Sequence, residues 1–135
     1  MRDHDTAMLA YAKLAGLSQS RGQLPPRDRF LLLAGVEALR AGYPQVAERC
    51  RELILTNNRH HMVGKFESFA QAAIDTEFLR LHAQIERGCP FEKAEHLLAG
   101  LDLTPDPPVL SADLRPGEYA LLLLGRSESR TEPLN

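Results

Sequence analysis

The sequence has few of the features that would assign a chemistry or a compartment to the protein. It contains only two cysteines, Cys50 and Cys89, too few for a disulfide scaffold, and a four-ligand zinc site needs more Cys or His at short spacing. The longest apolar stretches, 30–36 and 119–124, are far shorter than the roughly 20 residues that cross a bilayer. The N-terminus lacks the apolar core of a secretory signal. These absences predict a cytoplasmic protein with no membrane segment, no metal site and no cofactor.

Short catalytic motifs are also missing from the chain. There is no Gly-rich phosphate loop, no G-x-S-x-G nucleophile elbow, no H-E-x-x-H metal site and no C-x-x-C pair. His82 and Glu86 are four residues apart, as metal ligands on a helix can be, but two ligands do not make a site. The sequence therefore indicates no catalytic residue, and an enzyme with an unfamiliar site is kept as one alternative.

Charge is unevenly distributed along the chain, although the formal net charge is only -2. Residues 1–65 hold ten Lys or Arg against six Asp or Glu, whereas residues 66–135 hold six against twelve. Folding can bring the two halves together and cancel this difference, or it can leave a dipolar surface that orients a partner. The small total gives no reason to expect an anionic membrane or a nucleic acid as the partner.

What the sequence does contain is helical periodicity over most of its length. The 135 residues suit a single domain, and apolar residues recur at spacings of three and four. This pattern predicts an all-α fold, with helices over 5–15, 27–41, 44–56, 63–87 and 90–101. Three prolines within 105–108 exclude a helix there. We therefore expect a helical domain over 1–103 and a Pro-rich linker and tail over 104–135.

One apolar segment, 118–124, lies within that expected tail. It contains Tyr119 and four consecutive leucines, and periodicity over so short a run does not distinguish a strand from one or two helical turns. Such a segment would be an adhesive patch in water. We expect it to dock, either on the helices of its own chain or on another chain.

Two turns of similar chemistry suggest how the helices are arranged. Gly42 and Pro44 mark a tight turn between the second and third helices, and Gly88 and Pro90 repeat that pattern between the fourth and fifth. Helical hairpins of this kind bury their faces on neighbouring units. The expected architecture is two stacked antiparallel hairpins plus an N-terminal helix, followed by an irregular Pro-rich tail.

The first hairpin carries small residues at positions where paired helices approach each other. Gly35, Gly42 and Ala47 are in this register, and the segment, about 30 of the 135 residues, resembles the tetratricopeptide repeat family. It departs from that family at Arg51, where an apolar aromatic is usual, and no helix-ending proline follows. The resemblance implies a helical scaffold with a groove that binds peptides.

One polar turn is the candidate binding site. Arg59, His60, His61 and Lys65 lie where the expected 63–87 helix begins, and the unpaired amides of a helix N-terminus attract anions. Because histidine gains charge near pH 6.5, such a site would bind an acidic group more tightly as the pH falls. In the simpler interpretation the turn is only a solvated connector.

The leading functional hypothesis is a non-enzymatic protein–protein interaction or scaffold module. Helical hairpins, absent catalytic motifs and a short apolar segment after a linker all suit a protein partner, and a homo-oligomer is compatible with them. The alternative is binding of nucleic acid or a phosphate-bearing ligand through residues 59–65, with help from Arg49 and Arg51. Phosphate contacts dominate such binding, so the negative net charge argues against this alternative.

Overall fold

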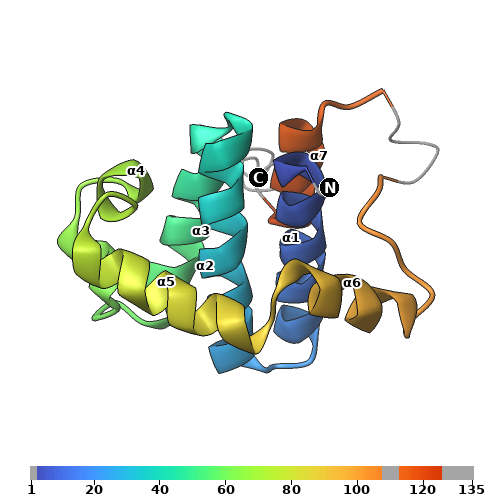
Figure 1. The fold of residues 1–135 in the computed structure, drawn as a ribbon, viewed down its shortest axis with the longest axis horizontal. Helices are drawn as coiled ribbons and strands as arrows, with labels where there is room; N and C mark the ends of the chain where they lie inside the picture. The colour runs from blue at the N-terminus through green and yellow to red at the C-terminus, as the bar shows by residue number, and fades with distance from the viewer. Residues whose placement is uncertain (1–2, 108–112, 126–135) are drawn as a thin grey trace, which may run out of the picture.

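A computed structural model describes residues 3–107 and 113–125, which form seven α-helices, one short 3-10 helix and no strand (Figure 1). The all-α prediction is confirmed. None of the helices in these residues is long and apolar enough to cross a membrane. The elements are α1 (His4–Ser20), α2 (Leu24–Ala41), α3 (Pro44–Asn57), η1 (Met62–Lys65), α4 (Phe69–Ala72), α5 (Thr76–Gly88), α6 (Phe91–Ala99) and α7 (Pro116–Leu123).

Local sequence signals account for the first three helices. The Asp3 carboxylate accepts a hydrogen bond from the Thr6 amide at the start of α1, at 2.6 Å. Gly42 ends α2 with a left-handed φ of 90°, and Pro44 opens α3 directly afterwards. The pairs α1–α2 and α2–α3 therefore pack as antiparallel neighbours. Helix α1 continues through Gly16 to Ser20, beyond the predicted end, because its apolar face is buried along α2.

The predicted long helix over 63–87 is wrong. The segment is divided into η1, α4 and α5, and a new N-cap precedes each α-helix. The Ser68 hydroxyl accepts a hydrogen bond from the Gln71 amide at 3.1 Å, and the Asp75 carboxylate accepts one from Phe78 at 3.0 Å. Both capping residues have extended backbones, since short polar side chains compete with helix continuation for amide protons. The Glu48 carboxylate of α3 also accepts a hydrogen bond from the Phe69 amide.

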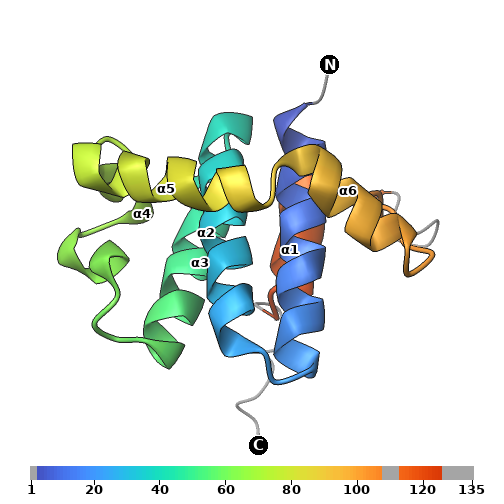
Figure 2. The same ribbon diagram turned by 60° about the horizontal axis from the view of Figure 1, so that its bottom comes forward.

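The second hairpin does not form either. Helices α5 and α6 follow one another across the α1–α2 pair instead of folding back side by side (Figure 2). α5 contacts α2, and α6 contacts α1. The Tyr11 hydroxyl donates a hydrogen bond of 2.9 Å to the Cys89 carbonyl at the junction of α5 and α6. A central antiparallel pair crossed by two successive helices thus replaces the expected stack of two hairpins.

The apolar segment 118–124 is helical and docks on its own chain. Residues 118–123 belong to α7, which packs against α1 and α3 and buries Tyr119 and Ala120, and Leu124, directly after the helix, is also buried. The Arg49 guanidinium donates a hydrogen bond to the Leu124 carbonyl at 3.2 Å and so ties the end of α7 to α3. The part of the expected tail beyond residue 125 lies outside the described residues.

Candidate functional site

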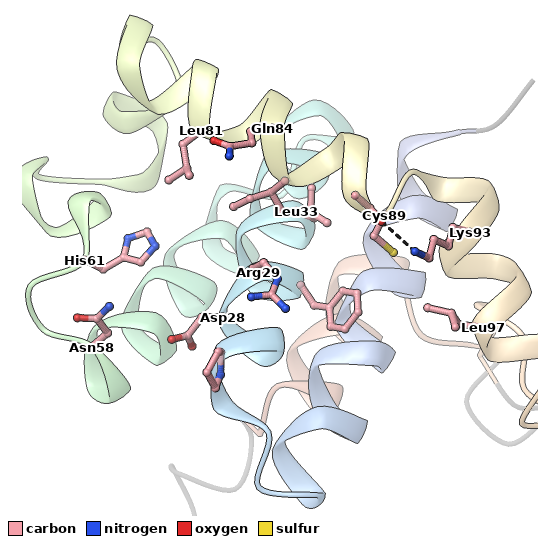
Figure 3. A pocket seen from close by; sticks show the side chains of 14 residues that line it. Asp28, Arg29, Leu33, Asn58, His61, Leu81, Gln84, Cys89, Lys93 and Leu97 are labelled. Atoms are coloured by element: carbon pink, nitrogen blue, oxygen red, sulfur yellow. Dashed lines mark hydrogen bonds between the residues drawn. The ribbon is translucent and has the colours of Figure 1, made fainter.

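A groove of about 750 Å³ lies between α2, α5 and the start of α6 (Figure 3). Its apolar part is formed by Phe30, Leu33, Leu81, Ile85 and Leu97. Polar side chains also line the groove, with Arg29 near the middle of the view in Figure 3, and they are Asp28, Arg29, Asn58, His61, Gln84 and Lys93.

The crossing of the helices opens this groove. α2 lies in the central pair and α5 runs across it, so the two helices touch over a limited length and leave space beside the contact. Phe78 of α5 is fully buried, whereas Leu81 and Ile85 are only partly covered. The hydrogen bond from Tyr11 to Cys89 holds the far end of α5 in place. The groove is therefore a consequence of helix orientation.

Among the described residues, Asp28 is the one carboxylate that lines the groove, and it already has partners within the chain. The Asp28 carboxylate lies 3.4 Å from the Arg27 guanidinium and accepts a hydrogen bond of 2.8 Å from the Asn57 side chain. Arg27 is itself buried and also donates a hydrogen bond to the Leu53 carbonyl. Burial lowers the pKa of Arg27, and the neighbouring Asp28 charge opposes that shift.

The cations of the groove are less engaged. Arg29 is exposed, and its guanidinium has no ion-pair or hydrogen-bond partner among residues 3–107 and 113–125. Lys93 is also exposed, and its ammonium group donates one hydrogen bond, to the Gly88 carbonyl at 3.2 Å. Because Asp28 is already paired, the groove presents unmatched positive charge to a ligand.

Of the four residues of the predicted binding turn, only His61 lines the groove. Arg59, His60 and Lys65 are exposed and do not line the groove, whereas His61 is half-buried and lines it. His61 Nδ1 accepts a hydrogen bond of 3.0 Å from the Val63 amide, so the proton of the neutral ring is on Nε2. Burial lowers the pKa of His61, with Asp28 acting in the opposite direction.

The two other arginines considered for phosphate contacts make internal interactions. Arg49 donates to the Leu124 carbonyl and lies 3.2 Å from the Glu52 carboxylate. Arg51 donates to the Phe66 carbonyl and lies 3.6 Å from the Glu48 carboxylate. Both guanidinium groups thus hold α3 to neighbouring segments.

The groove residues of α2 and α5 were not expected from the sequence. The sequence signal that could have indicated a groove on α2 was the 27–41 segment, which is apolar on nearly all sides and so needs more cover than one neighbour provides.

No group of three or more His, Cys, Asp or Glu that could hold a metal ion occurs within the described part of the chain. His82, paired with Glu86 in the sequence, is buried, and its Nε2 has no hydrogen-bond partner there.

No protein-family model, curated protein or solved structure matches the chain. The fold and the groove define the protein only as an all-α domain with an apolar, cation-lined groove.

Proposed function

We propose that the protein is a non-enzymatic protein–protein interaction module that binds a segment of another protein in the groove between α2, α5 and α6. The observation that carries this proposal is the apolar surface of the groove, bordered by two exposed cations, Arg29 and Lys93. Apolar surface supplies affinity when a partner covers it, and polar groups at the edge orient that partner.

The exposed leucines of α6 and the turn after it support this proposal. Leu97 is 40% exposed and Leu101 is 43% exposed, and both lie on the side of the molecule that carries the groove. Because both are already more than half covered, burying the remaining area of each contributes about 1 kcal/mol, less than half of the value for a fully exposed leucine. Clustered aliphatic side chains at the edge of a groove are typical of surfaces that another molecule covers.

The nucleic-acid alternative has less support. Two of its six proposed contacts, Arg49 and Arg51, make interactions inside the chain, which leaves the exposed cations Arg59 and Lys65 beside His60. Few phosphate contacts give weak binding, because affinity for nucleic acid grows with the number of phosphates neutralised. The resemblance to tetratricopeptide repeats also implies a groove that binds peptides, as the leading proposal does.

Site-specific photocrosslinking tests the proposal in the cells that make the protein. A benzoylphenylalanine would replace Gln84, which is exposed in the groove, and in a control it would replace Gln45, which is exposed on α3 away from it. We expect a protein adduct from position 84 that is absent from position 45 and is lost when Leu97→Glu places a charge in the groove. Equal adducts from both positions, or adducts insensitive to Leu97→Glu, would contradict groove binding. An adduct with a second copy of this chain would show self-association instead.

A further inference from the structure

A second hollow lies next to the groove. This hollow has a volume of about 420 Å³ and lies between the end of α1, the start of α2 and α6. Phe30 and Leu97 line both the groove and the hollow, so the two lie next to each other at these side chains. The apolar surface of the hollow is completed by Leu14, Leu17, Pro26 and Leu101. Apolar side chains thus line two adjacent hollows, from Leu81 and Ile85 of α5 to Leu14 and Leu17 of α1.

The charges without a partner of opposite sign along these two hollows are positive among the described residues. None of the described residues that line the second hollow is Asp or Glu, and the Asp28 carboxylate of the first is paired with Arg27 and Asn57. Arg29 stands in the groove and Arg21 in the hollow, and both are exposed without a side-chain partner in the described ranges. Lys93 is a third exposed cation in the groove, and its ammonium group contacts only the Gly88 carbonyl. A partner that brings carboxylates to this surface would therefore match its cations.

The apolar lining of the two hollows suits the apolar face of a helix as the bound element. A strand is added to a protein at the open edge of a sheet, and residues 3–107 and 113–125 contain no strand. Grooves between helices instead accept the apolar face of an amphipathic helix, whose apolar residues recur every three or four positions. Phe30 and Leu97 line both hollows, and a central apolar side chain of such a helix would pack on them.

We propose that the partner segment is an acidic amphipathic helix, with its apolar face on Phe30 and Leu97 and its Asp or Glu residues beside Arg21 and Arg29. This inference rests on the proposed function and adds the chemistry of the partner to it. Charges at the edge of an interface act mainly on association rate and on salt dependence, so binding should weaken as ionic strength rises.

Selection from a displayed library of helical peptides, randomised on all faces, against the purified full-length chain tests the inference. We expect the selected peptides to have apolar residues at helical spacing with Asp or Glu on one flank. Their affinity, measured by fluorescence anisotropy, should fall roughly tenfold in the Arg21→Glu/Arg29→Glu double variant. A peptide with Lys in place of its acidic residues should recover binding to that variant. A proline in the middle of the peptide should abolish binding to the parent protein.

The Arg59→Glu/Lys65→Glu double variant is the matched control, because it changes the net charge equally at exposed positions outside the groove. Its affinity for the peptides should equal that of the parent. If neutral or basic peptides are selected, and Leu97→Glu blocks them while the Arg21→Glu/Arg29→Glu variant does not, the acidic helix is refuted and groove binding stands. If binding is lost in the Arg59→Glu/Lys65→Glu variant and is unaffected by Leu97→Glu, both the acidic-helix inference and binding in the groove are refuted. If the library yields no binder, the acidic-helix inference fails, and the crosslinking experiment decides the proposed function separately.

Discussion

Gly35 of α2 lies against the ring of Phe69 of α4 so closely that a Cβ at position 35 would overlap the Cε2 and Cζ atoms of that ring. Phe69 is fully buried and meets Phe78 of α5 edge to face, with ring centroids 5.6 Å apart and an interplanar angle of 83°. The absence of a side chain at Gly35 thus lets α4, and through it α5, approach the central pair. The wall of the groove depends on this contact.

Replacing Gly35 with alanine should therefore destabilise the protein although alanine favours helices. The helix preference of alanine contributes up to about 1 kcal/mol, whereas overlap with a fully packed ring costs about 1–3 kcal/mol. Gly16→Ala is the matched control, because a Cβ there would meet only the Leu123 carbonyl oxygen at an ordinary 4.0 Å. Urea denaturation should show a lower free energy of unfolding for Gly35→Ala and an equal or higher one for Gly16→Ala. Equal stability of the two variants would contradict the contact.

Docking of α7 on its own chain leads to a second prediction. Ala120 is fully buried where α7 packs against α1 and α3, so Ala120→Glu would bury an unpaired charge or displace the helix. The expected loss in the free energy of unfolding is more than about 2 kcal/mol. Leu122→Glu, at a position that is 41% exposed, should change it by less than about 0.5 kcal/mol. Thermal denaturation of both variants measures the difference, and a similar small effect in both would mean that α7 is not docked in solution.

The burial of His82 predicts that the free energy of unfolding falls in mild acid. Its side chain is 4% exposed and its Nε2 has no hydrogen-bond partner in the described structure. Burial lowers the pKa of His82 in the folded state, Arg40 lowers it further, and Glu86 and Glu37 oppose the shift. The unfolded chain therefore binds the proton more readily, with a pKa near 6.5. The stabilisation from the neutral ring is complete above about pH 6.5 and is lost as the pH falls from there toward the folded-state pKa. His61 contributes with the same sign.

Substitution of His82 isolates this contribution. His82→Leu keeps a side chain of similar volume and cannot take up a proton, so the decrease in unfolding free energy between pH 7.5 and pH 5.5 should become smaller. His60→Gln, at an exposed position, should leave that decrease unchanged. Chemical denaturation at the two pH values gives the comparison. A pH dependence identical in His82→Leu and the parent protein would assign the effect to other groups.

The two cysteines should differ in reactivity, and one of them reports on the groove. Complete burial raises the pKa of Cys50 to about 12, so its thiol should react with iodoacetamide only when the protein unfolds. Cys89 is partly exposed in the groove, where burial raises its pKa and Lys93 opposes the shift. At pH 8, mass spectrometry should find Cys89 labelled first, and a peptide bound in the groove should slow that labelling. Labelling of Cys50 at the rate of Cys89 would contradict the buried position of Cys50.

Local signals were sufficient to predict the helices α1, α2 and α3 from the sequence. Each has a continuous apolar face, and Gly42 and Pro44 define the turn between α2 and α3 within a few residues. These signals are local because a helix is built from contacts three and four residues apart. The caps at Ser68 and Asp75 are also local, but the apolar stripe runs across them without a change of period, so periodicity alone predicted one long helix.

Only the tertiary structure decided where the site is. The groove lies between α2 and the α5–α6 segment, which are far apart in the chain, and contacts such as Tyr11 with Cys89 and Glu48 with Phe69 set their orientation. His61, whose ring accepts a hydrogen bond from the Val63 amide, lines the groove, while Arg59, His60 and Lys65 are exposed outside it. Periodicity specifies which face of a helix is buried, but not what buries it. The sequence by itself therefore determined the fold class and the central helices, and long-range packing determined the groove and the residues that line it.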